Sequence, residues 1–165
     1  MIVTIIVDAS HCPSTMAGGY GFWLASQRGC SAGGGSFKES IPHSRCAEIC
    51  AIVNAFHSGV SKGRILPGDE VLIQNDCLSA IDFLQDPRGK GGHSFEKKAA
   101  ELFCSIMLMG GVKVNFRHVK GHTSTRDQRS KSQGICDHVA KKHMREARAK
   151  ILNNKEALCA DDTPK

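Results

Sequence analysis

The pattern of apolar and polar residues predicts strands early in the chain and mainly helices later. The β-branched run 2–7 is typical of a buried strand, and residues 20–26 and 36–41 predict two further strands. Because successive strands joined by short turns pair in opposite directions, these three favour an antiparallel arrangement. Residues 70–74 and 112–119 predict a fourth and a fifth strand.

Helical periodicity appears in four segments, which are residues 43–58, 77–84, 94–109 and 135–152. The order is therefore strand–strand–strand–helix–strand–helix–helix–strand–helix. Such an order predicts an α/β fold, with a five-stranded mixed sheet that carries helices on both faces. We expect one domain over residues 1–152 and a flexible C-terminal tail over residues 153–165.

Composition agrees with a single globular domain. The chain has 165 residues, of which 41% are hydrophobic, and this length suits one core. The apolar start is too short to cross a bilayer and lacks the basic region of a signal peptide. The 8 cysteines are scattered and form no C-x-x-C pair, so we expect reduced thiols. These features predict a cytoplasmic monomer without a membrane partner.

The positive charge is concentrated in one late segment. The net charge is +6, and residues 113–150 carry 11 Lys and Arg against 3 Asp and Glu. A basic segment of this kind often follows a phosphate backbone. A solvated helix face explains the same charge about equally well, so charge alone leaves the partner open.

Four acidic residues stand at places where a functional site would form. Asp8 and Asp76 end the first and fourth predicted strands, Glu48 interrupts an apolar helical run, and Asp137 opens the last helix. Functional groups gather at the carboxyl ends of strands in α/β sheets. Each acid alone also fits a turn, a cap or a rim position. Four together repel one another unless a cation holds them, and an all-oxygen set suits Mg²⁺ or Mn²⁺.

These acids lie within motifs that resemble those of type 1 ribonuclease H. The resemblance extends over about residues 2–145 and is most specific near its end. Its motifs are Val7-Asp8-Ala9-Ser10, Ala47-Glu48-Ile49, Asn75-Asp76-Cys77, His118-Val119-Lys120-Gly121-His122 and Cys136-Asp137-His138-Val139-Ala140.

The resemblance implies the ribonuclease H-like fold and hydrolysis of the RNA strand in an RNA–DNA hybrid. It implies two Mg²⁺ ions about 4 Å apart, with Mn²⁺ able to substitute. Asp8, Glu48, Asp76 and Asp137 would hold the ions, and His122 would assist proton transfer or product release. The expected substrate contacts are Ser10, Arg45, Lys120, Arg126, Arg129, Lys141 and Lys142.

Two other functions stay open at this point. One is a metal-dependent nuclease of the same fold that cuts DNA, for example at branched structures. The other is a nucleic-acid-binding module without catalysis. The clustered acids argue against the binding module, because carboxylates repel phosphates unless a cation lies between them.

Overall fold

The structure is a computed structural model that describes residues 1–88, 91–120 and 128–161, with side chains for all of these except 128–130 and 155–161. The order of strands and helices expected from the sequence is confirmed. Several boundaries differ, and two of the differences concern the acidic residues Asp8 and Asp137.

The five strands form one mixed sheet. They are β1 (Ile2–Cys12), β2 (Ala17–Ser26), β3 (Gly29–Ser36), β4 (Glu70–Asn75) and β5 (Lys113–His118), and their spatial order is β3-β2-β1-β4-β5. The first three strands pair antiparallel, whereas β4 lies parallel to both β1 and β5.

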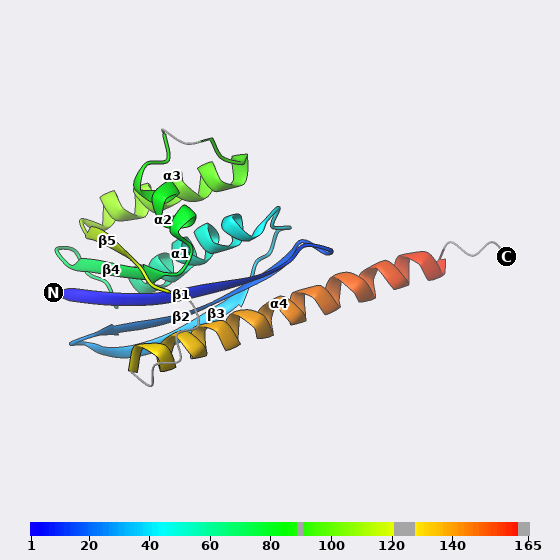
Figure 1. Ribbon diagram of the computed structural model, residues 1–165, viewed down its shortest axis with the longest axis horizontal. Helices are drawn as coiled ribbons and strands as arrows, with labels where there is room; N and C mark the ends of the chain where they lie inside the picture. Colours follow the sequence, from blue (N-terminus) through cyan, green and yellow to red (C-terminus); the bar gives the residue numbers. More distant parts are fainter. Residues whose placement is uncertain (89–90, 121–127, 162–165) are drawn as a thin grey trace.

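Helices cover both faces of this sheet (Figure 1). On one face lie α1 (Ser44–Ser61), α2 (Leu78–Gln85) and α3 (Ser94–Gly110). The other face is covered by α4 (Gln128–Asp161), which packs on β1, β2 and β3. The α/β class with helices on both faces is thus confirmed.

The main core lies between the sheet and α1. Alternate residues of β1 point to this face, and Val3, Ile5 and Val7 are fully buried. They share one apolar cluster with Ile52 and Phe56 of α1. This packing fixes α1 against the strand that carries Asp8.

The third strand is not where the pattern predicts it. The glycine-rich segment forms β3 (Gly29–Ser36), whereas most of the predicted strand 36–41 lies outside the sheet. Glycine is required here by close packing: a Cβ at Gly34 would lie 2.4 Å from the carbonyl oxygen of Tyr20 and 2.5 Å from Val139. Glycines that usually indicate a turn therefore mark a strand approached closely by its neighbours.

β1 is also longer than predicted, so Asp8 lies within the strand and not at its end. Residues 8–12 pair with β2, with Asp8 opposite Gly21. On the other side, the last residue pair of the parallel ladder is Ile6 with Gln74. Asp8 is therefore paired with β2 on one side, while the ladder with β4 on its other side has already ended.

α4 begins earlier and ends later than the predicted helix 135–152. It starts at Gln128 and reaches Asp161, so Asp137 lies well inside the helix instead of opening it. The helix is polar over most of its surface, and such helices persist where one side packs on a core. The division of the chain at residue 152 stays a prediction.

None of the helices in the described part of the chain combines the length and apolar character that a membrane crossing requires. The seven cysteines whose side chains are described are free thiols.

Glycines on β2 allow α4 to approach the sheet closely. A Cβ at Gly21 would lie 2.4 Å from the carbonyl oxygen of Cys136, closer than real Cβ atoms come. We expect Gly21→Ala to lower the free energy of unfolding by about 3 kcal/mol, because helix and sheet must separate. Chemical denaturation measures this change.

Two glycines in open or ordinary surroundings serve as controls. Among the described residues, no atom outside the backbone of α4 lies within 4 Å of a Cβ built at Gly134, so Gly134→Ala is expected to stabilise the helix by about 1 kcal/mol. Gly35 of β3 would make only ordinary contacts. Equal effects of substitution at Gly21 and Gly35 would contradict the close packing of α4.

Candidate metal centre

Asp8 and Asp76 are brought together by the register of two parallel strands. Ile6 of β1 pairs with Gln74 of β4, so the residues two positions later are Asp8 and Asp76. Asp76 directly follows the end of β4. The backbone pairing therefore places the two carboxylates at the same level of the sheet.

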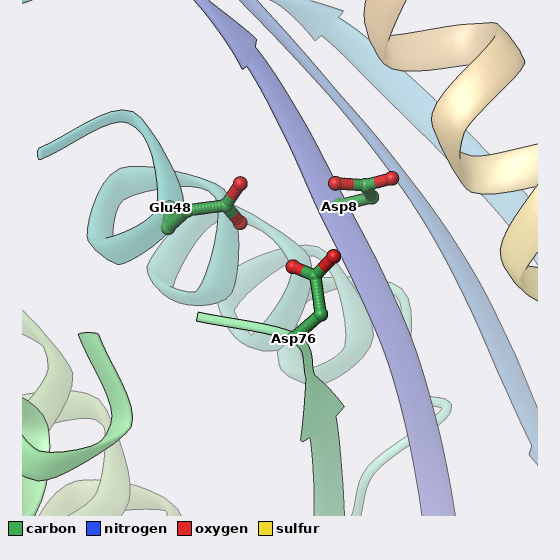
Figure 2. A group of neighbouring side chains, drawn as sticks. All are labelled: Asp8, Glu48 and Asp76. Atoms are coloured by element: carbon green, nitrogen blue, oxygen red, sulfur yellow. The ribbon is translucent and has the colours of Figure 1, made fainter. Parts of the chain in front are cut away.

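Glu48 reaches the same point from α1. One carboxylate oxygen from each of Asp8, Glu48 and Asp76 lies within 4.8 Å of the others. Figure 2 shows the three side chains converging from a strand, a helix and the end of a second strand. All three residues are partly buried. The predicted grouping of these acids is thus seen in the structure.

The electrostatics of this group disfavour three bare negative charges. Burial, followed by repulsion from Asp76 and Asp137, raises the pKa of Asp8 from 3.8 to about 6. Burial is also the main cause that raises the pKa of Glu48 from 4.5 to about 8, with repulsion from Asp8 and Asp76 adding to it. A cation between the carboxylates would reverse both shifts.

Asp137 lies near this group without belonging to it. Among the described residues, the carboxylates close enough to share one cation do not include Asp137. Its charge nevertheless acts on Asp8, and the preceding residue Cys136 donates its Sγ–H to the carbonyl oxygen of Ile6, at 3.4 Å. The Asp137 carboxylate accepts a hydrogen bond from Lys141 Nζ at 2.8 Å. Three of the four predicted acids therefore meet, and the fourth is paired with a lysine.

Asn75 is a site residue that the sequence reasoning missed. It is fully buried, and its Nδ2 donates to Glu48 Oε2 at 2.8 Å and to the carbonyl oxygen of Val7 at 3.1 Å. Its Oδ1 accepts from the backbone N–H of Cys77 at 2.9 Å. A polar residue at an inward position of an apolar strand is the signal that could have identified it.

The predicted substrate contacts have different surroundings. Ser10 lies on β1 and is partly buried, while Lys120 is exposed just beyond β5. Lys141 is paired with Asp137, and exposed Lys142 lies 4.0 Å from Glu146. His122 and Arg126 fall outside the described residues, as does the side chain of Arg129.

Arg45 takes part in a buried ion pair. Its Nε and Nη2 donate to the two carboxylate oxygens of Glu96, at 2.8 and 2.7 Å, and Glu96 is fully buried. The guanidinium also lies 5.6 Å from the centre of the Phe83 ring. These contacts hold the start of α1 against α2 and α3.

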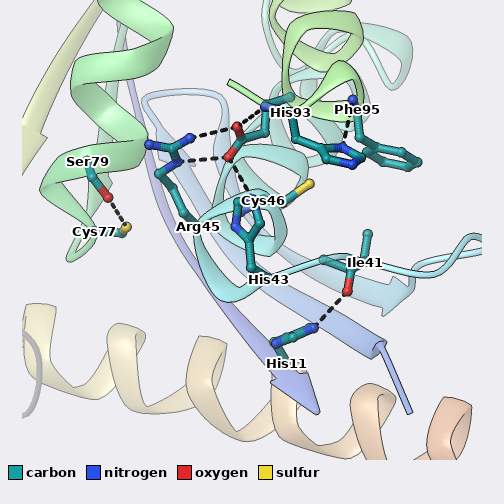
Figure 3. A network of polar contacts seen from close by, with 10 residues as sticks. His11, Ile41, His43, Arg45, Cys46, Cys77, Ser79, His93 and Phe95 are labelled. Atoms are coloured by element: carbon teal, nitrogen blue, oxygen red, sulfur yellow. Dashed lines mark hydrogen bonds and ion pairs between the residues drawn. The ribbon is translucent and has the colours of Figure 1, made fainter. Parts of the chain in front are cut away.

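Two histidines, which Figure 3 labels together with Arg45, complete the surroundings of Glu96. His43 Nε2 lies 3.6 Å from one carboxylate oxygen, and the His93 backbone N–H donates to the other at 2.9 Å. Burial opposes ionisation of Glu96, but the bonds from Arg45 and His93 outweigh it and lower the pKa of this carboxyl. The spacing of Glu96 from the helix start is typical of a capping box, which is the signal that could have identified it.

Similarity to solved structures establishes the fold. The N-terminal RNase H domain of a Mycobacterium tuberculosis protein, solved as a fusion with maltose-binding protein, matches with a TM-score of 0.69 at 14% identity, over 90% of this chain and 97% of that one. RNase H1 from the archaeon Halobacterium salinarum matches with a TM-score of 0.68 at 13% identity, over 89% and 100%.

A third structure contains nucleic acid. LC11-RNase H1 in complex with an RNA/DNA hybrid matches with a TM-score of 0.63 at 15% identity, over 85% of this chain and 97% of that one. At these identities the similarity confirms the ribonuclease H-like fold. A scan against models of protein families gives no match, and a search of curated proteins gives none either.

The raised pKa values predict how stability depends on pH without metal. The folded-state pKa of Glu48 is about 8 against an ordinary value of 4.5. The contribution of Glu48 to the free energy of unfolding is therefore fully present below pH 4.5 and is lost as pH rises to 8. Glu48→Gln removes this loss and should raise the free energy of unfolding by about 2 kcal/mol at pH 8. Denaturation in chelator at pH 5 and pH 8 measures the difference.

The exposed carboxylate Glu101 of α3 provides the matched control. Glu101→Gln should leave the stability unchanged at both pH values. If Glu48→Gln stabilised the protein equally at pH 5 and pH 8, the crowding of charge at the site would be refuted.

The ion pair of Arg45 predicts a structural effect of its removal. Arg45→Met leaves Glu96 buried without its main partner, which should lower the free energy of unfolding by about 3 kcal/mol. The double variant Arg45→Met/Glu96→Met should recover much of the loss. The surface pair partner Lys142 is the control, since Lys142→Met should cost less than about 1 kcal/mol. A stable Arg45→Met variant with weakened nucleic-acid binding would instead support a substrate contact.

Proposed function

We propose that this protein is a metal-dependent endonuclease that hydrolyses the RNA strand of RNA–DNA hybrids. The observation that carries the proposal is the convergence of Asp8, Glu48 and Asp76, with oxygens within 4.8 Å of one another, on a ribonuclease H-like sheet. The structural neighbour that is complexed with an RNA/DNA hybrid supports the choice of substrate.

The chemistry of the acidic group fits a hard divalent cation. All of its candidate ligands are carboxylate oxygens, which Mg²⁺ prefers and Mn²⁺ accepts. The pKa values of Asp8 and Glu48 are raised by burial and by neighbouring carboxylates, so a cation at this point would stabilise their charged forms. We assign Asp8, Glu48 and Asp76 as ligands, joined by Asp137 for a second ion.

Bound Mg²⁺ would supply Lewis-acid stabilisation of the phosphate and lower the pKa of a bound water. The chain's own residues provide the geometry. Asp8 groups with Glu48 and Asp76, and the charge of Asp137 also acts on its carboxyl. It is therefore the residue suited to two ions. Asp137 has to exchange its lysine partner Lys141 for a cation before it can act as a ligand.

The basic surface beside the acids suits a phosphate backbone. Lys120 is exposed beyond β5, and exposed cationic side chains continue along α4 at Lys142, Arg145 and Arg148. If Asp137 binds a cation, the side chain of Lys141 is freed and would add a further positive charge near the scissile phosphate. Contacts of this kind supply affinity but not sequence recognition. His122, Arg126 and Arg129 remain part of the proposal through the resemblance alone.

Cleavage of matched substrates tests the proposal. We expect cutting of the RNA strand in an RNA–DNA hybrid with Mg²⁺, and none in chelator. RNA duplex, DNA duplex and a four-way DNA junction should be cut far more slowly. Asp8→Asn should reduce cleavage to background while the unfolding transition is retained, because it removes the central carboxylate.

The exposed Glu101 again offers a control, since Glu101→Gln removes a charge from α3 away from the acids. This variant should cut the hybrid at the wild-type rate. Equal cutting of DNA duplex and hybrid would replace the proposal with a DNA nuclease of the same fold. Binding of the hybrid without any cleavage would point to a module without catalysis.

A further inference from the structure

Asn75 connects the three segments that carry the acidic group. It is the last residue of β4 and directly precedes Asp76. Its Nδ2 donates to the carbonyl oxygen of Val7, which directly precedes Asp8. The same nitrogen donates to Glu48 Oε2 on α1, at 2.8 Å. One amide side chain thus touches Glu48 itself and the backbone beside Asp8.

The hydrogen bonds of Asn75 allow only one orientation of its side-chain amide. An amide nitrogen carries two N–H donors, and here two acceptors face it, the Val7 carbonyl and the Glu48 carboxylate. The amide oxygen faces a donor, the backbone N–H of Cys77, at 2.9 Å. Turning the amide over would oppose like groups at all three contacts. Asn75 therefore holds the Glu48 carboxylate in a fixed position and also fixes the backbone of Cys77, the residue after Asp76.

The position of Asn75 breaks the pattern of its strand. The inward residues of β4 are Val71, Ile73 and Asn75, and each is fully buried. A fully buried amide is costly to desolvate, and an apolar residue of similar shape often serves a core equally well. A polar side chain at the one inward position that contacts Glu48 therefore points to a role at the site.

We infer that Asn75 is a positioning residue of the metal centre, which orients the Glu48 carboxylate toward Asp8 and Asp76. This inference rests on the function proposed above. Three like charges within 4.8 Å push one another apart, so a carboxylate on a flexible side chain would turn away without a partner. The donor Nδ2 opposes this movement before any cation arrives. Partners of this kind tune metal affinity through the ligands that they hold.

A matched asparagine separates this role from ordinary support of the fold. Asn115 on the neighbouring strand β5 also donates Nδ2 to a glutamate, Glu70 Oε1, at 2.5 Å. Glu70 begins β4, whereas Asn75 ends it. Asn115→Leu therefore removes the same kind of hydrogen bond from the same sheet, but at the end of β4 that lies away from the acidic group.

Calorimetric titration with Mg²⁺ measures the effect without substrate. We expect Asn75→Leu and Asn75→Ser to weaken Mg²⁺ binding by about 10-fold or more, whereas Asn115→Leu should bind as the wild type does. In hybrid cleavage, the Mg²⁺ concentration for half-maximal rate should rise by a similar factor, with the rate recovering at saturating Mg²⁺. A purely structural role would not produce this recovery.

Three results would overturn the inference. They are unchanged Mg²⁺ binding by folded Asn75 variants, equal weakening in Asn115→Leu, and failure of both Asn75 variants to fold, which would assign the residue to folding. Asn75→Ser is included because it is smaller and retains a polar group if Asn75→Leu does not fold. Failure of the proposed function is a separate outcome, since the wild type itself would then neither bind Mg²⁺ nor cleave the hybrid.

Discussion

The structure depends above all on the parallel pairing of β1 with β4. This pairing fixes Asp8 and Asp76 at one level of the sheet, because Ile6 lies opposite Gln74 two residues earlier. A shift by one residue would turn one of the two carboxylates to the opposite face. The buried residues of β1 against α1 resist such a shift, since it would bring Thr4 and Asp8 to the side of the core. The apolar core and the acidic site are therefore fixed by the same register.

The register creates an electrostatic cost that other residues have to offset. Asp8 and Glu48 have raised pKa values because they are buried near like charges, and Asn75 offsets part of this cost by donating a hydrogen bond to Glu48. On the other face, close packing at Gly21 brings Asp137 and Lys141 of α4 near Asp8. Lys141 lowers the pKa of Asp8 by its charge. Without metal, the site is thus stabilised by protons, an amide and a lysine. A divalent cation can replace the protons and the lysine, whereas the amide of Asn75 continues to hold Glu48.

The sequence could predict the parts of the fold that follow local periodicity. The buried run of β1, the helix carrying Glu48 and the position of Asp76 after a strand were all recognisable, and the structure confirms them. Strand β3 was not recognisable, because glycine normally indicates a turn. The glycine at Gly34 is instead required by close contact with Tyr20 of β2 and Val139 of α4, which no local pattern reveals. Asn75 and Glu96 were missed for a similar reason: their roles arise from partners on other elements.

Arg45 illustrates how context decides the role of a charge. By residue type it suits a phosphate contact, and its position one turn before Glu48 places it close to the site. In the structure it pairs with Glu96, which is fully buried and also accepts a hydrogen bond from the backbone N–H of His93. A guanidinium held by two oxygens of a buried carboxylate is costly to withdraw, because the carboxylate would be left without its charge partner. The pair with Glu96 therefore holds the start of α1, whose first turns carry Glu48 toward the sheet, and a phosphate contact by Arg45 stays a prediction.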